Sequence, residues 1–352
     1  MRNNRKRWLV GLTVAAAVIL LLLFGWGYAA SRPPRVGPER LLVVRSGETV
    51  DEVAADMSKL GLVRSGFMFR WYVTLHGEAS ALEAGTYRFT PGLSIRELVS
   101  ALIQGKVYVP TVKVTIPEGF TVTQIASRLA AAGVCSKQSF LQTEQQGHFT
   151  EAFLRLIPNN AQVRYRLEGY LFPDTYMFEK HEPAHQVIDT MLQDFAQHIG
   201  GSVMAQIHQS GQTLPQVITI ASMVEREAQV SSERPIIASV IDNRLRLHMH
   251  LRIDATIEYI VGHTNIVTYQ DLKVQSPYNT YLHRGLPPGP ISNPGMASID
   301  AAIHPAHTDY LYYVARYDGT GRHYFATTWS QQLKNEALSQ QNYKRMVGTG
   351  GK

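Results

Sequence analysis

The chain has 352 residues, 45% of them hydrophobic, and a single cysteine, Cys135. This length allows two or three domains with sizeable cores and excludes general disorder, while one cysteine excludes an internal disulfide or a cysteine-rich metal site. The net charge is +6, but four positive charges lie in the first seven residues, so the rest of the chain carries only +2. So small a surplus gives no reason to expect nucleic-acid binding.

The first 30 residues predict a membrane anchor. Residues 8–30 contain no charged side chain and are long enough to cross a bilayer as a transmembrane helix. The basic residues 1–7 are expected to form a cytoplasmic tail, which places the rest of a single-pass protein on the outer face of the cytoplasmic membrane. A cleavable signal peptide is the competing interpretation, because residues 27–29 form a passable cleavage site.

An internal repeat follows a proline-rich linker at residues 31–40. GETVDEVAADMSKLGLV at 47–63 aligns without a gap with GFTVTQIASRLAAAGVC at 119–135, and GLSIRELVSAL at 92–102 is a shorter copy. Each copy has a turn glycine, a Ser or Thr N-cap and apolar residues at helical spacing. Each therefore predicts a capped amphipathic helix.

Short strands are predicted beside these helices at residues 41–44, 86–89 and 112–116, from their β-branched and aromatic side chains. A strand, a capped helix and a strand in this order resemble a LysM-like module, which we assign to residues 41–110. LysM-like folds often bind amino-sugar polymers. A small α+β spacer without a ligand fits the same pattern.

Residues 111–345 predict a catalytic domain that opens with a second LysM-like repeat at 112–135. Its other helices are expected in three segments, at residues 214–228, at residues 234–245 and from residue 330 onward. Between them lie loops dense in Pro, Gly, Asn and Tyr, such as SPYNTYLHRGLPPGPISNPG at 276–295, and loops of this length usually line a site. The predicted fold class is therefore α+β, with an N-terminal transmembrane helix, a small LysM-like module and a mostly helical catalytic domain with long groove-forming loops.

The helix predicted at 214–228 ends in two glutamates, Glu225 and Glu227, on either side of an arginine. At 100° per residue both lie about 80° from the apolar stripe of this helix, so both are expected at the margin of the core. Partial burial raises the pKa of a carboxyl and makes it a usable general acid near neutral pH. Structural salt bridges with arginines such as Arg234 or Arg244 fit the same positions, and spacing does not choose between the two glutamates.

Several long motifs follow one another in the second half of the chain. They are LEGYLFPDTY at 167–176, ASMVEREA at 221–228, SVIDNRL at 239–245, the 276–295 loop and AAIHPAHTDYLYYVA at 301–315. Together with the anchor and the LysM-like repeat, they resemble the endolytic murein transglycosylase family, also called YceG-like or MltG. The resemblance covers nearly the whole chain in the family's order.

The resemblance implies a lyase that cleaves the β-1,4 bond between N-acetylmuramic acid (MurNAc) and N-acetylglucosamine (GlcNAc) inside peptidoglycan strands and leaves 1,6-anhydroMurNAc ends. One carboxyl protonates the leaving oxygen and then takes the proton of the sugar's own C6 hydroxyl, so this reaction needs no second carboxylate. The resemblance places this acid at Glu227, with Glu225 as the alternative or as a supporting residue. It also implies peptidoglycan strands as the substrate, peptidoglycan synthases as partners, and a role in cell-wall assembly and glycan-length control.

Two other functions fit the same sequence. A non-catalytic scaffold of the cell-wall synthesis machinery would bind peptidoglycan through the LysM-like module and use the glutamates structurally. A true hydrolase would use water in place of the C6 hydroxyl and leave reducing ends. The chemistry of the products separates all three.

Six further residues are predicted to bind substrate: Glu168, Asp174, Asp254, Tyr278, Asn279 and Tyr281. Aromatic faces suit pyranose rings, and carboxylate and amide groups suit sugar hydroxyls. Turn and cap hydrogen bonds explain Glu168 and Asp174 equally well. Around Asp254, the segment LRIDATIEY departs from the family's LQ-x-D-x-T-V-x-Y pattern at Arg252 and Ala255.

No cofactor or catalytic metal is expected. His248 and His250 are two residues apart, and a proline interrupts the pair His304 and His307. Neither pair has metalloenzyme spacing such as H-E-x-x-H.

Overall fold

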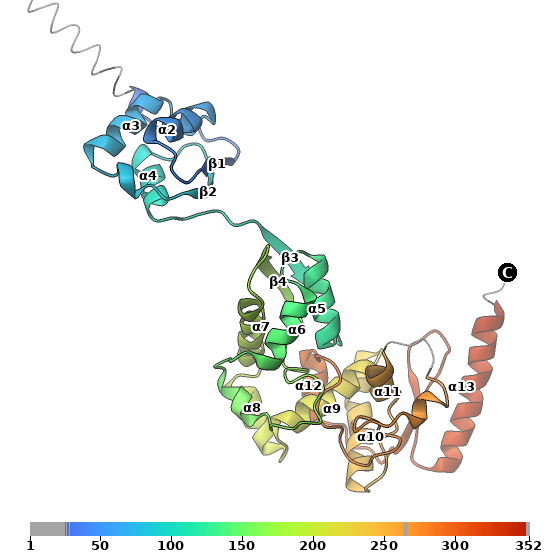
Figure 1. Cartoon of the computed structure of the whole chain (residues 1–352). Coiled ribbons are helices and arrows are strands. Elements are labelled where there is room, and N and C mark those ends of the chain that lie inside the picture. Colours follow the sequence, from blue (N-terminus) through green and yellow to red (C-terminus); the bar gives the residue numbers. More distant parts are fainter. Residues whose placement is uncertain (1–24, 26, 28, 263–266, 350–352) are drawn as a thin grey trace, which may run out of the picture. The chain divides into compact units, whose positions relative to one another are not determined.

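The computed structural model describes residues 25, 27, 29–262 and 267–349. The chain divides into two compact units, residues 1–110 and residues 111–352 (Figure 1). The predicted cytoplasmic tail and most of the predicted transmembrane helix lie outside the described residues. Within the part that is described, no helix is both long and apolar enough to span a bilayer.

The first unit is a two-stranded antiparallel sheet covered by helices. Its elements in chain order are β1 (Arg40–Val44), α2 (Val50–Lys59), α3 (Gly66–Leu75), the short η1 (Ala79–Ala81), β2 (Gly85–Phe89) and α4 (Ile95–Ile103). Strands β1 and β2 pair so that Leu42 lies opposite Tyr87. Both of these side chains are buried in a core that all three helices share. The α+β class is confirmed.

The repeated segments form capped helices, as the sequence predicts. Thr49, Ser94 and Thr121 each accept a hydrogen bond from the backbone N–H three residues on. In each case the Glu or Gln at that third position bonds back to the cap's own N–H, which completes a capping box. The local pattern of these segments therefore determines where α2, α4 and α5 begin.

Helix α3 was not predicted from the sequence. Its ten residues, GFMFRWYVTL, are apolar around most of the helix, and the side chain of the N-cap residue Ser65 makes no capping hydrogen bond. Without a polar face or a capping signal, such a run looks like a strand or a buried segment. In the structure α3 packs on α2 and inserts Phe69 and Val73 into the core.

The second unit opens with the same order of elements as the first. These are β3 (Thr111–Thr115), α5 (Val122–Ala131), α6 (Lys137–Gln146), β4 (Thr175–Glu179) and α7 (Ala184–His198). Strand β4 pairs antiparallel with β3, as β2 pairs with β1. The repeat thus continues past residue 135, and the segment 147–174, which contains η2 (Ala152–Leu156), interrupts it. This insertion hides the second half of the repeat from sequence comparison.

The rest of the second unit is largely helical. It contains α8 (Gly201–Gln209), α9 (Leu214–Glu227), η3 (Ser231–Glu233), α10 (Arg234–Arg246), α11 (Asp254–Val261), η4 (Asp271–Lys273), α12 (Met296–Ile303), the hairpin β5 (Tyr312–Ala315) and β6 (His323–Ala326), and α13 (Trp329–Thr349). The predicted helices at 214–228 and 234–245 match α9 and α10 to within one residue at each end. Helix α9 begins as predicted, with Thr213 as its N-cap and Pro215 in its first turn.

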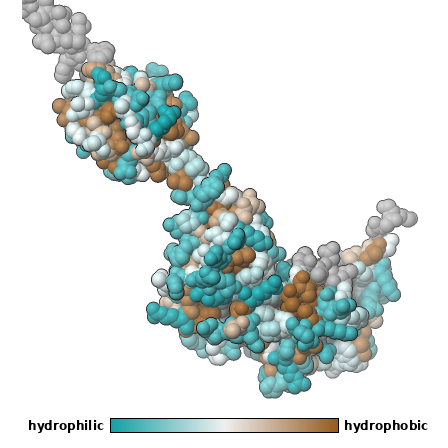
Figure 2. All heavy atoms as spheres, viewed as in Figure 1, coloured by the Kyte–Doolittle hydropathy of each residue, from teal (hydrophilic) through white to brown (hydrophobic). Residues whose placement is uncertain are grey.

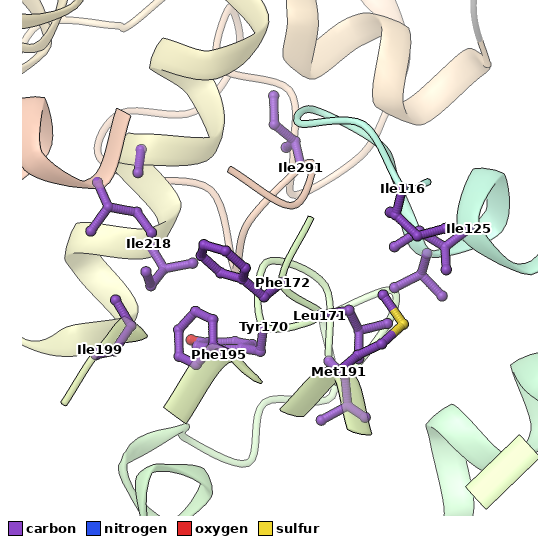
Figure 3. Packing of buried hydrophobic residues seen from close by; sticks show 14 of the residues in the cluster. Ile116, Ile125, Tyr170, Leu171, Phe172, Met191, Phe195, Ile199, Ile218 and Ile291 are labelled. Carbon is purple, nitrogen blue, oxygen red and sulfur yellow. The ribbon is translucent and has the colours of Figure 1, made fainter. Parts of the chain in front are cut away.

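One hydrophobic core runs through the second unit. Ile218 of α9, Phe195 of α7 and Phe172 of the inserted segment belong to the same buried cluster (Figure 3). The face drawn in Figure 2 is mainly hydrophilic on both units, with hydrophobic residues in separate patches. Helix α9 is buried along almost its whole length, so the residues at its end are held firmly in place.

A buried polar contact joins three loops beside this core. The Asn293 side chain donates to Phe120 O at 2.9 Å and accepts from the backbone N–H groups of Gly169 and Leu171 at 3.0 and 2.9 Å. It also donates to the Glu168 carboxyl at 3.1 Å. Gly169 has a φ of +90°, and an added Cβ would lie 2.6 Å from Pro290, so this junction has no room for a larger residue. Asn293 therefore holds the 276–295 loop against two other segments.

We expect Asn293→Ala to lower the free energy of unfolding by about 3 kcal/mol, because it leaves two buried N–H groups without an acceptor. Chemical denaturation of the full chain, followed by far-UV circular dichroism, measures the change. Asn159→Ala is the matched control, because Asn159 is exposed and should change stability by less than about 0.5 kcal/mol. Equal stability of the two variants would contradict the structural role of Asn293.

Candidate active site

Three consecutive side chains at the end of α9 point to three different partners. Glu225, Arg226 and Glu227 all lie at the margin of the core, partly exposed, as predicted for the two glutamates. Carboxylates at the C-terminal end of a helix are disfavoured by its dipole, so other groups must compensate them. Each of the two glutamates finds such groups at the N-terminus of another helix.

Glu225 is held by a charged group and two hydrogen-bond donors. Its carboxylate lies 3.3 Å from the Arg234 guanidinium and accepts hydrogen bonds from Gly295 N at 3.1 Å and Ser298 Oγ at 2.8 Å. Gly295 is the N-cap of α12, so the positive end of that helix faces the carboxylate. Both side chains of the ion pair are nearly buried, with 12% of Arg234 and 7% of Glu225 exposed. Glu225 therefore has the environment of a structural carboxylate, with Arg234 as one of the partners foreseen from the sequence.

Arg226 pairs with Glu258 of α11 at 2.8 Å. This ion pair ties α11 to the end of α9. It also keeps the arginine away from Glu227, which is left without a cationic partner among the described residues. The other foreseen arginine, Arg244, instead donates to the backbone carbonyls of Leu251 and Leu311.

Glu227 has neutral hydrogen-bond donors in place of the cationic partner of Glu225. The Tyr313 hydroxyl and the backbone N–H of Ala255, in the first turn of α11, donate hydrogen bonds to its carboxyl. Burial, and after it the nearby negative charge of Asp254, raise the pKa of Glu227 to about 7. The two hydrogen bonds act in the opposite direction but do not cancel this shift. A carboxyl with this pKa is readily both protonated and ionised at neutral pH.

Asp254 and Tyr281 extend the site next to Glu227. The Tyr281 hydroxyl donates a short hydrogen bond to the Asp254 carboxylate, and the Asn279 side chain fixes Tyr281 by accepting from its backbone N–H at 2.9 Å. Asp254 is exposed and Tyr281 is partly exposed. Of the predicted substrate-binding residues, these two are the ones that the structure brings to Glu227.

A large cavity opens beside these residues. Its volume is about 680 Å³, and Tyr281 and Tyr313 form part of its wall. Tyr312 and Trp329 add aromatic surface, with ring centroids 5.6 Å apart. This cavity is large enough to receive part of a polymeric ligand.

The other predicted site residues are placed elsewhere or fully used within the protein. Glu168 is 0% exposed, accepts from Val122 N at 2.9 Å and Tyr259 Oη at 3.2 Å, and has a pKa that burial raises to about 8. Asn279 is also 0% exposed, and its amide bonds to backbone groups of its own loop. Tyr278 is buried, and its hydroxyl accepts from the Arg164 backbone N–H.

Asp174 lies on the surface just before β4. Its carboxylate accepts from the backbone N–H of Thr175 at 2.6 Å, which is one of the turn contacts considered from the sequence. Glu168, Tyr278 and Asn279 therefore shape the loops behind the site. In the described part of the chain, no hydrogen bond or ion pair joins Asp174 to the residues around Glu227.

Sequence reasoning did not find several residues around the two glutamates. Tyr313 is in β5, within the YLYYVA motif, but no local signal distinguishes it from its tyrosine neighbours. Glu118 lies close to Glu225, and burial together with the charge of Glu225 raises its pKa. Its carboxyl also packs on Gly295, where an added Cβ would clash with Glu118 Oε1. Among the described residues, no group of three or more His, Cys, Asp and Glu side chains is arranged to hold a metal ion.

Comparison with known proteins agrees with the motifs around this site. The YceG-like family matches residues 42–337. The chain belongs to this family. A crystal structure of a YceG-like protein from Listeria monocytogenes is similar, with a TM-score of 0.59 and 32% sequence identity, covering 84% of this chain and 99% of that one.

Two curated relatives of the family carry a functional name. An endolytic murein transglycosylase from Bacillus subtilis is 33% identical over 285 residues, which cover 78% of each chain. One from Streptococcus pneumoniae is 32% identical over 318 residues, covering 84% of this chain but 57% of the pneumococcal protein. The chain thus spans little more than half the length of the second relative.

The contacts of Glu227 predict opposite pKa changes in two variants. Asp254→Asn removes a negative charge, so the pKa of Glu227 should fall by about one unit, whereas Tyr313→Phe removes a donor to the carboxylate, so this pKa should rise by a similar amount. NMR titration of the chain labelled at the glutamate side-chain carboxyls measures both shifts, with the signal assigned by its loss in Glu227→Gln. Shifts of the same sign in both variants would contradict the proposed environment.

Proposed function

We propose that this chain is an endolytic murein transglycosylase, a lyase that cuts the β-1,4 bond between MurNAc and GlcNAc within peptidoglycan strands. The observation that carries this proposal is the contrast between the two glutamates of α9. Glu225 is compensated by Arg234 and two hydrogen-bond donors, whereas Glu227 is hydrogen-bonded to Tyr313 in the wall of a large cavity and has a pKa of about 7. The names of two relatives, each about one third identical over most of this chain, support the activity and disfavour a non-catalytic scaffold.

In the proposed mechanism Glu227 acts twice. The protonated carboxyl donates its proton to the glycosidic oxygen as the bond between this oxygen and C1 of MurNAc breaks, and GlcNAc leaves with a free 4-hydroxyl group. The carboxylate then takes the proton of the MurNAc C6 hydroxyl while its oxygen bonds to C1. Glu227 ends protonated, as it began, and no water is consumed.

The residues around Glu227 support this cycle without taking part in covalent chemistry. Tyr313 and the Ala255 N–H stabilise the carboxylate after the first proton transfer, and the charge of Asp254 favours taking up the second proton. We propose that Tyr281 and the aromatic surface of Tyr312 and Trp329 contact the sugar rings.

We further propose the cellular arrangement that the sequence predicts. Residues 8–30 anchor the chain in the cytoplasmic membrane, and the linker at 31–40 leads to the body on the outer face. The LysM-like unit at 41–110 binds glycan, and the catalytic unit that follows trims strands alongside peptidoglycan synthases. The β-α-α-β-α order found in both units supports a common LysM-like origin of the two repeats.

Product analysis of two glutamate variants tests the proposed activity. The full chain in detergent is incubated with uncrosslinked glycan strands, and mass spectrometry identifies the new ends. Wild type should give 1,6-anhydroMurNAc ends, and Glu227→Gln should lower the rate by at least about a hundredfold, because it removes the general acid. Glu225→Gln should keep the same products but reduce stability by about 3 kcal/mol, because it leaves Arg234 nearly buried without its ion-pair partner.

Glu179→Gln is the silent control, because Glu179 is exposed on β4. Loss of anhydro ends only in Glu225→Gln would move the acid to that residue. Reducing ends from wild type would make the chain a hydrolase. A folded wild type that binds strands without cutting them would favour the scaffold and refute the enzyme.

A further inference from the structure

The cavity beside Glu227 has an unusual charge for a site that receives a sugar polymer. Three arginines line it, Arg244, Arg252 and Arg284, and one carboxylate, Glu336. His248 and His250 add further nitrogen donors. Neutral amino sugars are recognised well by aromatic rings and neutral polar groups, so they do not account for this concentration of positive charge.

Two of the three arginines are available to a ligand. The Arg244 guanidinium donates to the carbonyls of Leu251 and Leu311 and lies over the Tyr312 ring, so it forms part of the wall. Arg252 and Arg284 are exposed, and neither side chain has a hydrogen bond or ion pair with another described residue. Both side chains border the same cavity, and neither forms an ion pair with a carboxylate of the described residues.

The backbone fixes the position of Arg252. Its φ is +49°, in the left-handed region that residues with a Cβ rarely adopt, and His248 on the same cavity has a φ of +53°. Thr280 holds this conformation, since its carbonyl accepts from Arg252 N at 3.1 Å and its hydroxyl accepts from Ile253 N at 3.0 Å. Arg252 is thus presented at the cavity two residues before Asp254. Non-glycine residues in this conformation tend to occur at functional sites.

We propose that this cavity binds a carboxylate of the stem peptide attached to MurNAc at the cleavage site, through Arg252 and Arg284. This inference rests on the proposed transglycosylase function. An intact strand carries its carboxylates on the stem peptides, and a guanidinium binds a carboxylate with two parallel, charge-assisted hydrogen bonds. Because Tyr313 both lines the cavity and bonds to Glu227, the peptide of a MurNAc unit would enter the cavity while the glycan lies across the acid. The site therefore selects strands that still carry peptides.

The test compares two substrates with the full chain in detergent. One is uncrosslinked glycan strands with their stem peptides, and the other is the same strands after an amidase has removed the peptides. Removal leaves a carboxylate on the lactyl group of each MurNAc, so the two substrates differ in where their carboxylates lie. Wild type should cleave the peptide-bearing strands with a kcat/KM about tenfold higher, which corresponds to one charge-assisted contact.

Substitution of the two arginines should remove this preference. Arg252→Gln and Arg284→Gln keep hydrogen-bonding capacity but lose the charge, and each should lower kcat/KM on peptide-bearing strands by about tenfold, mainly through KM. Cleavage of stripped strands should not change. Arg252→Lys keeps the charge without the planar fork and should retain an intermediate preference. Arg155→Gln is the matched control, because Arg155 is exposed and outside the cavity lining.

Each outcome decides between specific alternatives. Equal cleavage of both substrates by wild type would overturn the inference while leaving the proposed activity intact. Equal losses on both substrates in the arginine variants would assign the contact to the lactyl group or the glycan and would also overturn it. If folded wild type cuts neither substrate, the proposed function itself fails, and this inference falls with it.

Discussion

The structure around the site depends on one buried polar junction between Asn293 and Glu168. The two side chains hydrogen-bond to each other, and together they bond to backbone groups of the 117–122 and 167–171 segments, while Asn293 itself belongs to the 276–295 loop. Buried polar groups are costly unless every one finds a partner, so such a network has a single satisfied arrangement. This arrangement brings the 276–295 loop to the end of α9. It therefore determines where Gly295, which contacts Glu225, is placed.

This junction also helps to give the two glutamates different environments. Each residue of a helix is rotated by about 100° from the one before it, so side chains two residues apart point in nearly opposite directions. Glu225 and Glu227 therefore cannot share one environment. The 276–295 loop delivers the N-terminus of α12 to Glu225, and the ion pair between Arg226 and Glu258 holds α11 against the other side of α9. Glu225 gains the N-terminus of α12 and, from the start of α10, the Arg234 guanidinium, whereas Glu227 gains only neutral donors and a neighbouring carboxylate. Two chemically identical residues therefore acquire different partners because of the elements that meet them.

The parts of the fold that the sequence predicts are those that local interactions determine. The capping boxes at Thr49, Ser94 and Thr121 and the apolar stripe of α9 each depend on residues within one or two turns. Spacing also placed both glutamates at the edge of the core. It could not assign the acid, because that assignment depends on Tyr313 and Arg234, which other elements supply.

The predicted substrate-binding residues differ in exposure for the same reason. Glu168 is a polar residue in a loop motif, which is typical of a binding site, yet it is buried by contacts with Val122, 46 positions away, and Asn293, 125 positions away. Asn279 is used by its own loop, and Tyr281, two residues later, faces the cavity. Sequence shows that this loop carries polar and aromatic groups, but only the tertiary contacts decide which of them remain free for a ligand.

A carboxyl that must give a proton and then take one works best when neither of its forms is strongly preferred. A glutamate in water is almost fully ionised at neutral pH and is a poor proton donor, and a carboxylate in an ion pair is in general held in that form still more firmly. A fully buried carboxyl without hydrogen-bond donors would instead stay protonated, because its carboxylate would be too unstable to form. Glu227 lies between these limits, since burial and Asp254 favour the neutral form while Tyr313 and the Ala255 N–H stabilise the charged one. The proposed single-carboxyl mechanism requires this balance, and the end of α9, the start of α11 and strand β5 produce it.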